Sequence, residues 1–171
     1  MVDPRASRNR VRRWRRTDLL KLKTIAWETW QQTYGDFIPE KDMRSFHDVY
    51  YKPASLTRMY NAINVEGWVS MADQKLVGYS MSHWNPETKV FYLTSLYVLP
   101  DYQKQGFGKA MLERGIDLAR SLGTDRLKLG VMAENRQARE WYERQGFLFN
   151  DHKMFAVGNT LVDDLLGYKL I

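Results

Sequence analysis

Residues 97–109 read Tyr97-Val98-Leu99-Pro100-Asp101-Tyr102-Gln103-Lys104-Gln105-Gly106-Phe107-Gly108-Lys109, and they join a strand-like run to a helical one. Gly106 and Gly108 lack a Cβ, so they allow the backbone to turn tightly before the helix. Consecutive N–H groups then converge on the helix N-terminus, a geometry that binds anions. The spacing fits neither the Walker loop nor the G-x-G-x-x-G pattern. We therefore predict a phosphate-binding turn of another kind, with a plain strand-to-helix turn as the alternative.

A second group of residues lies further along the chain, on a segment with helical spacing. Asn135 and Tyr142 are two helical turns apart, so both can face the same groove. Ala138 lies between them and leaves a low surface over which a ligand chain could pass. An amide and a phenol would then line one side of a binding groove. The alternative for Tyr142 is a half-buried core tyrosine.

The hydrophobic periodicity around these two motifs predicts a mixed α/β architecture. Stretches of period two predict strands over residues 11–16, 68–72, 76–82, 90–98, 126–132, 153–157 and 165–170. Helical spacing predicts helices over residues 19–30, 40–50, 54–61, 110–122 and 135–145. An antiparallel meander followed by strand, helix, strand and helix makes a mixed sheet with helices on both faces.

The composition limits the kinds of site that the chain can carry. With 171 residues, 44% of them hydrophobic, it fits one domain with a substantial core. It contains no cysteine, which excludes disulfides, thiolate zinc sites, iron–sulfur clusters and a cysteine nucleophile. The three histidines are scattered, so we expect no metal. No apolar run approaches the roughly 18–20 residues that span a bilayer, so we expect a cytoplasmic protein without a membrane partner.

The net charge of +6 belongs to the beginning of the chain. Residues 1–16 hold seven arginines against Asp3 alone, whereas residues 17–171 hold 19 basic and 19 acidic residues. We divide the chain into a basic N-terminal arm over residues 1–10 and a single domain over residues 11–171. The arm is either a small basic binding segment or a solvated terminus that leads into a strand. Because the remainder is balanced, nucleic acid is not an expected partner.

Both motifs resemble the acetyl-coenzyme A motifs of the GNAT superfamily of N-acetyltransferases. The resemblance rests on QKQGFG at 103–108 and on Asn135-Arg136-Gln137-Ala138-Arg139-Glu140-Trp141-Tyr142-Glu143-Arg144-Gln145-Gly146-Phe147, and it extends over residues 11–170. It implies the GNAT fold: a mostly antiparallel sheet of six to seven strands, with helices on both faces and two parallel strands that splay apart. It also implies acetyl-CoA as co-substrate and no metal.

The resemblance assigns roles to individual residues. Backbone groups of Leu96, Tyr97 and Val98 would pair with the pantetheine arm, and Asn135 would meet it. Tyr142 would be catalytic, because it aligns with the tyrosine that protonates the departing thiolate in many relatives. The amides of the glycine turn would wrap the pyrophosphate, and the implied cofactor-binding residues of this turn are Gln103, Lys104, Gln105, Gly106, Phe107, Gly108 and Lys109.

The resemblance also implies that the acceptor is bound by residues 26–40, which combine aromatic and acidic side chains. Glu28, Trp30 and Tyr34 could hold a cationic amine by ionic and cation–π contacts. Core packing is the alternative for the tryptophans. The segment is similar to the matching part of microbial spermidine/spermine N-acetyltransferases, as are residues 152–158 and Asp163-Asp164-Leu165. A small-molecule amine, with a polyamine as one candidate, is therefore the expected substrate, and a homodimer is left open.

The proton acceptor for the amine is not evident from the sequence. Relatives that acetylate ribosomal protein N-termini place a glutamate five residues before the asparagine, where this chain has Gly130. The remaining candidates are Glu28, Asp36, His83 and ordered water. Without cysteine we expect direct transfer in a ternary complex. The alternatives are a protein N-terminal or lysine acetyltransferase, and a non-catalytic acetyl-CoA-binding module.

Overall fold

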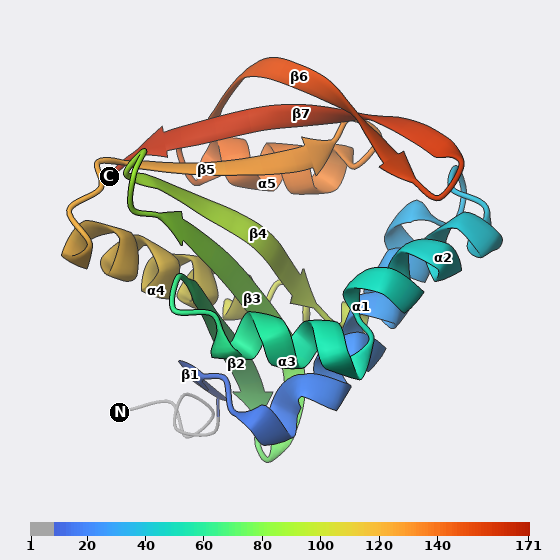
Figure 1. The fold of residues 1–171 in the computed structure, drawn as a ribbon, viewed down its shortest axis with the longest axis horizontal. Helices are drawn as coiled ribbons and strands as arrows, with labels where there is room; N and C mark the ends of the chain where they lie inside the picture. Colours follow the sequence, from blue (N-terminus) through green and yellow to red (C-terminus); the bar gives the residue numbers. More distant parts are fainter. Residues whose placement is uncertain (1–8) are drawn as a thin grey trace.

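The computed structural model describes residues 9–171, so residues 1–8 of the predicted basic arm lie outside the described part of the chain. Two short 3₁₀ turns, η1 (Arg16–Asp18) and η2 (Pro100–Tyr102), accompany the helices and strands. In chain order these are β1 (Asn9–Arg13), α1 (Leu19–Tyr34), α2 (Glu40–Tyr50), α3 (Pro53–Asn61), β2 (Val65–Ala72), β3 (Lys75–Asn85), β4 (Val90–Val98), α4 (Phe107–Ser121), β5 (Arg126–Met132), α5 (Arg136–Arg144), β6 (Leu148–Val157) and β7 (Thr160–Leu170) (Figure 1).

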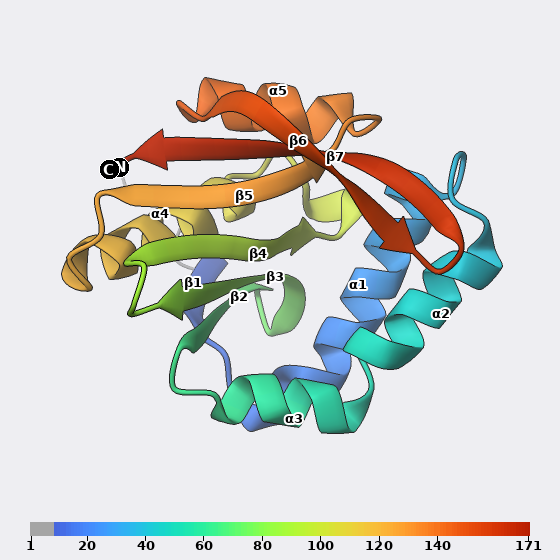
Figure 2. The ribbon, with the colours of Figure 1, turned by 45° about the horizontal axis from the view of Figure 1, so that its top comes forward.

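The strands form one seven-stranded sheet in the order β1-β2-β3-β4-β5-β7-β6. Every neighbouring pair is antiparallel except β4 and β5, which run parallel. The helices α1, α2 and α3 lie on one side of the sheet, and α4 and α5 lie on the other (Figures 1 and 2). Apolar side chains of both layers bury against the sheet. The predicted mixed α/β architecture is confirmed.

The parallel pairing of β4 and β5 is short. Only residues 91–93 of β4 pair with residues 127–129 of β5. Directly beyond this point Thr94 forms a β-bulge, because Leu93 lies opposite Ser82 whereas Ser95 lies opposite Met81. The Thr94 hydroxyl donates to the Met81 carbonyl over 2.9 Å. A bulge bends its strand, so β4 turns away from β5 where the extra residue is inserted.

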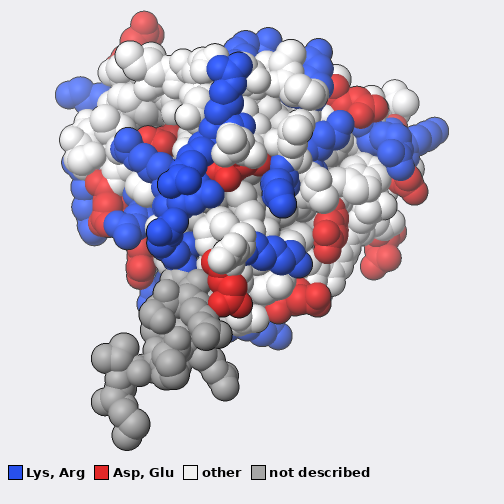
Figure 3. Space-filling model, turned by 90° about the horizontal axis from the view of Figure 1, so that it is seen from below, with Lys and Arg blue, Asp and Glu red and all other residues white. Residues whose placement is uncertain are grey.

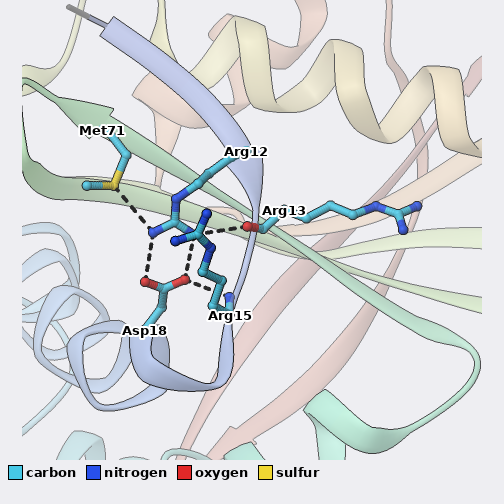
Figure 4. Close-up of polar contacts among 5 residues, drawn as sticks. All are labelled: Arg12, Arg13, Arg15, Asp18 and Met71. Carbon is cyan, nitrogen blue, oxygen red and sulfur yellow. Dashed lines mark hydrogen bonds and ion pairs between the residues drawn. The ribbon is translucent and has the colours of Figure 1, made fainter.

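The start of the domain is fixed by an ion pair between β1 and the residue before α1 (Figure 4). Arg12 donates two hydrogen bonds, of 2.8 and 2.9 Å, to the Asp18 carboxylate. The Arg15 N–H donates to the same carboxylate over 2.6 Å. Burial raises the pKa of Asp18, but these hydrogen bonds outweigh burial and hold the pKa below its ordinary value. Arg12 also contacts the Met71 sulfur on β2 at 3.8 Å.

Several element boundaries differ from the sequence prediction. The first strand runs over Asn9–Arg13 instead of 11–16, because η1 occupies the residues that follow it. The last two strands are longer than predicted and span Leu148–Val157 and Thr160–Leu170. Most side chains of β6 are exposed, so the alternating pattern that predicts a strand over residues 153–157 does not extend to its first five residues.

Charged side chains of both signs cover the face seen from below, with one gathering of Lys and Arg near its centre and Asp and Glu around it (Figure 3). This mixture agrees with the equal numbers of acidic and basic residues over 17–171. None of the helices within residues 9–171 is long and apolar enough to span a membrane.

His47 on α2 is buried among aromatic rings. It stacks on Tyr51 with ring centroids 4.6 Å apart, and Trp27 and Trp30 each approach it edge-on at 5.1 Å. Neither ring nitrogen has a hydrogen-bond partner among the residues that the structure describes. Burial lowers the pKa of His47 from 6.5 to about 4, so the imidazole is neutral in the folded protein at neutral pH.

We expect this histidine to make the fold sensitive to acid. The unfolded chain binds a proton at His47 below pH 6.5, whereas the folded chain does so only near pH 4. The stabilisation is therefore complete above pH 6.5 and is lost as the pH falls toward 4, by roughly 2–3 kcal/mol. Urea unfolding of wild type and His47→Phe at pH 7.5 and 5.0 measures the difference. His152→Gln is the opposite case: Asp163 raises the pKa of His152, so losing this histidine should enlarge the acid loss, whereas losing His47 should reduce it. An unchanged loss in His47→Phe would contradict the assignment.

Candidate active site

The glycine turn between η2 and α4 adopts the backbone conformation that its sequence predicts. Gly106 precedes α4 with φ of +87°, in the left-handed region that glycine tolerates best. Lys104 also has a positive φ, of +60°. A Cβ built on Gly106 would have no atom within 4 Å. The glycine is therefore required by the backbone conformation of the turn and not by crowding from the protein.

The main-chain donors of this turn are free. Gln103 N–H donates to the Pro100 carbonyl and Ala110 N–H donates to the Gly106 carbonyl. Between them, no acceptor within residues 9–171 receives a hydrogen bond from the N–H groups of Lys104 to Lys109. Several free N–H groups at a helix N-terminus form an anion site, and the helix dipole adds roughly 0.3–1 kcal/mol per charge. The turn can therefore hold a pyrophosphate.

A cavity of about 570 Å³ extends from this turn into the gap between β4 and β5. Residues 94–98 of β4 have β3 on one edge and no described strand on the other, so their backbone is available to an extended ligand. The cavity gathers most of the predicted cofactor residues, namely Leu96, Tyr97, Val98, Gln103, Lys104, Gly106, Phe107, Gly108, Lys109 and Asn135, together with the predicted catalytic Tyr142. Contact of these residues with a cofactor stays a prediction.

Three of the predicted cofactor residues have side chains that contact the protein itself, which the sequence did not indicate. The Gln103 side chain donates to the Val98 carbonyl over 3.0 Å, so this backbone group already has a partner. Phe107 is buried in the core, so only its backbone N–H faces a ligand. Gln105 lies outside the cavity lining, and its side chain donates back to the Asp101 carbonyl over 3.0 Å. Only the main chain of Gln105 remains available as predicted.

Asn135 and Tyr142 lie on the same side of α5, as their spacing predicts. The Asn135 side-chain oxygen accepts a hydrogen bond from the Ala138 N–H over 3.1 Å and so caps the helix. Burial raises the pKa of Tyr34 to about 12, although a hydrogen bond from the Asn135 side chain opposes the rise. Asn135 therefore connects α5 to α1 across the cavity.

Tyr142 faces the cavity as a protonated phenol. Its ring packs against Trp141 and Phe147, with centroids 4.8 and 5.4 Å away. Burial, and to a smaller extent Tyr34, raises the pKa of Tyr142 above its ordinary value. No hydrogen bond to another described residue involves the Tyr142 hydroxyl. A phenol with its proton in place and no protein acceptor can donate to a ligand in the cavity.

A second cavity, of about 580 Å³, opens from the other side of the same gap. It shares seven lining residues with the first cavity: Tyr34, Leu93, Thr94, Ser95, Tyr97, Leu129 and Gly130. The rest of its wall is largely aromatic and carries few charged groups. These further lining residues include Trp30, Phe46, Tyr50, Tyr51, His83, Tyr92, Lys153, Phe155 and Asp164.

The predicted substrate residues meet this second cavity unequally. Tyr34 lines both cavities. Trp30 lines the second, but it is only 3% exposed, stacks on Phe46 at 4.7 Å and donates to the Tyr97 hydroxyl over 3.0 Å. Glu28 lines neither cavity, because the helix turns about 100° per residue and directs this position away from Trp30 and Tyr34. Its role as a substrate residue stays a prediction that the geometry does not support.

The candidate bases also differ in whether they line a cavity. Asp36 is exposed and, like Glu28, lines neither cavity. His83 lines the second cavity, with its Nε2 atom 2.8 Å from the Asn64 side-chain nitrogen. Asp164 is the one carboxylate in this wall among the described residues, and no chemical role was predicted for it from the sequence. A signal for it was present, since an aspartate followed by Leu165 and Leu166 in a strand is unusual. Within residues 9–171 no His, Asp and Glu cluster could hold a metal ion.

Comparisons with known proteins agree with this geometry. The Acetyltransferase (GNAT) family matches residues 21–147. An uncharacterized N-acetyltransferase of Mycobacterium tuberculosis is 26% identical over 142 residues, which cover 83% of this chain and 90% of that protein. The PaiA N-acetyltransferase of Thermoplasma acidophilum, solved with coenzyme A, superposes with a TM-score of 0.82 at 21% identity, covering 95% of this chain and 99% of that one. The spermidine N-acetyltransferase of Vibrio cholerae, solved with coenzyme A and spermine, has a TM-score of 0.72 at 21% identity over 96% of both chains.

We expect Gly106→Val to abolish coenzyme A binding. A branched side chain in the left-handed region costs roughly 1–2 kcal/mol, so the turn would change conformation and scatter its N–H groups. Gly123→Val is a matched control, because Gly123 follows the other end of α4 with φ of +71° and no atom within 4 Å of a built Cβ. Both variants should lose similar stability in thermal melts. Only Gly106→Val should lose calorimetric binding of coenzyme A, and a dissociation constant within twofold of wild type would contradict the anion site.

Proposed function

Because this chain belongs to the acetyltransferase (GNAT) family, we propose that it transfers an acetyl group to the primary amine of a small molecule, by direct attack in a ternary complex. As a GNAT acetyltransferase it uses acetyl-CoA. The acceptor is the proposed part, and a polyamine is the first candidate.

The observation that carries the proposal is the meeting of two cavities in the gap between β4 and β5. One cavity begins at the free N–H groups of the glycine turn, and the other has an aromatic wall with one carboxylate. A thioester held by the first would present its carbonyl carbon in the shared region, where an amine from the second could reach it. Holding two reactants in line in this way removes a large part of the barrier.

The wall of the second cavity suits a cationic amine with an aliphatic chain. The faces of Tyr50 and Tyr92 can attract an ammonium group and pack against methylene groups, whereas Phe46 is stacked between Trp30 and Tyr50 and offers only its edge. Asp164 supplies a negative charge and Lys153 a positive one, so the wall has no large excess of either sign. The Vibrio cholerae neighbour was solved with spermine, which is why a polyamine is the first acceptor to test.

The residues of this chain divide the chemistry between the two sides of the gap. The thioester of acetyl-CoA supplies an acetyl group that is already activated. A backbone N–H near Leu96 or Val98 would donate to the carbonyl oxygen as negative charge develops on it. Tyr142 would give its proton to the departing sulfur. Because the chain has no cysteine, no acyl-cysteine forms, and transfer to the amine is direct.

The acceptor class is tested with a panel of polyamines, aminoglycosides, amino acids and alanine-terminated peptides, by release of free coenzyme A thiol. We expect spermidine or another small primary amine to give kcat/KM at least tenfold above any peptide. Faster turnover of the peptides would indicate a protein acetyltransferase. Coenzyme A binding without turnover of any acceptor would indicate a non-catalytic binding module.

We expect Tyr142→Phe to lower kcat about a hundredfold, the usual effect of losing a general acid. The ring and its contacts with Trp141 and Phe147 remain, so the dissociation constant of coenzyme A should stay near the wild-type value. Tyr60→Phe is the control, because Tyr60 packs on Trp14 at 5.5 Å away from both cavities. Steady-state kinetics with the best amine of the panel measure both, and wild-type turnover in Tyr142→Phe would remove the phenol from the mechanism.

A further inference from the structure

A carboxylate from β7 fills the space above Gly130 on β5. In the antiparallel register of these strands Met132 lies opposite Asp164, and Gly130 lies opposite Leu166. A Cβ built on Gly130 would lie 2.4 Å from the Asp164 Oδ2 atom and 3.0 Å from the Oδ1 atom. The absence of a side chain at position 130 therefore leaves the room that the Asp164 carboxylate occupies.

This carboxylate lies at the point where the two cavities meet. Gly130 lines both cavities, and Asp164 lines the second. Tyr34 also lines both, and it interacts electrostatically with Asp164. The Asp164 oxygens are therefore placed at the acceptor side of the gap, whereas Tyr142 lines the cofactor side.

The Asp164 carboxylate is partly buried, and no hydrogen bond or ion pair joins it to another residue of the described chain. The preceding Asp163 differs, since its Oδ1 atom lies 2.8 Å from His152 Nδ1 at the surface. Burial raises the pKa of Asp164, Lys153 on β6 opposes the rise, and Asp163 adds to it. The other titratable groups of this cavity lie on α1, on α2 or directly after it, and on β3 and β4. In that order they are Tyr34, Tyr50, Tyr51, His83, Tyr92 and Tyr97.

We propose that Asp164 is the general base of the acetyl transfer, which takes a proton from the acceptor ammonium in the gap between β4 and β5. The assignment rests on the proposed function, since it requires an amine acceptor in the second cavity. It uses a carboxylate from β7 that occupies the volume left open by glycine at position 130 of β5.

The step balances in atoms and electrons. The acceptor ammonium gives one proton to the Asp164 carboxylate, and the nitrogen lone pair then forms the C–N bond to the thioester carbon. The C–S bond breaks, and its electron pair leaves with sulfur. The second nitrogen proton is lost to solvent or along the Tyr34 side, while Tyr142 protonates the sulfur and regains a proton from water. Asp164 returns its proton to solvent, so one proton is released overall for each ammonium acetylated.

The need for this base follows from the acceptor. A primary ammonium has a pKa near 10.4, so its deprotonation at pH 7 costs about 4–5 kcal/mol. A carboxylate within reach can accept this proton as the C–N bond forms, and general bases contribute about 10²–10⁴ in rate.

The test compares wild type, Asp164→Asn and Asp164→Glu, with Asp163→Asn as matched control, between pH 5.5 and 9.5. Spermidine is the first probe, replaced by the fastest amine of the panel if another is preferred. We expect Asp164→Asn to lower kcat at pH 7 about a hundredfold and to move the acid limb of the kcat profile to higher pH, toward the ionisation of the amine itself. Its deficit should shrink about tenfold per pH unit, because free amine becomes available. Asp164→Glu should recover part of the rate. Asp163→Asn should keep the wild-type kcat at pH 7, with its acid limb at slightly lower pH because Asp163 raises the pKa of Asp164.

The outcomes separate this proposal from the function on which it rests. Wild type that acetylates no amine of the panel overturns both. An active wild type with a similar kcat and acid limb in Asp164→Asn overturns the base alone. An acid limb that keeps its wild-type position in Asp164→Asn and moves to higher pH in His83→Gln assigns the base to His83 instead. A raised KM with unchanged kcat reduces Asp164 to a binding group and also overturns the proposal.

A second variant tests the same carboxylate without replacing it. Gly130→Ala would place a Cβ against Asp164 Oδ2, so the carboxylate must move. We expect kcat to fall at least fivefold, with the dissociation constant of coenzyme A and the melting temperature close to wild type. Adding Gly130→Ala to Asp164→Asn should cause no further loss of kcat, because the two changes act on one group. Fully additive losses would show that they act separately and would overturn the assignment.

Discussion

The structure depends on one interruption in a β-ladder. Thr94 inserts an extra residue into β4 immediately after the three residues that pair with β5, and its hydroxyl bonds back to the Met81 carbonyl. Continuous parallel pairing would close the sheet and leave no gap. Because pairing stops after Leu93, one edge of β4 stays open to a ligand, and two cavities can meet in the middle of a well-packed domain.

The chain directs different chemistry to the two sides of this gap. On one side the loop before α4 offers unpaired main-chain N–H groups, which require glycine at position 106 and little else from side chains. On the other side α1, α2 and β7 supply aromatic rings and one carboxylate. The Trp30 indole donates to the Tyr97 hydroxyl and so ties α1 to the splayed end of β4. This hydrogen bond and the burial of Trp30 fix that part of the wall of the second cavity.

Local features of the sequence were sufficient for most of the fold and for most of the residues that line the first cavity. The residues 90–98 and 126–132 predicted as strands match β4 and β5, and the spacing of Asn135 and Tyr142 correctly put both on one side of a helix. The strand β6 was predicted too short. Most of its side chains are exposed, so its first five residues show no alternation of apolar and polar positions. Glu28 was chosen by composition, but its helical position directs it away from the cavities. Asp164 was given no role because its meaning depends on the register of β5 against β7, which no local pattern encodes.

The contact between Gly130 and Asp164 changes how a missing functional group should be judged. Neighbouring strands in a sheet project side chains into a common volume, so a charge lost from one strand can be replaced from the next while the volume keeps its electrostatic character. Aligned column by column, two such proteins would look like an intact enzyme and a defective one. Superposed in space, they would present the same oxygen atoms to the same reactant. What this volume contains is therefore specified by the pairing of β5 with β7, and not by the residue at one position alone.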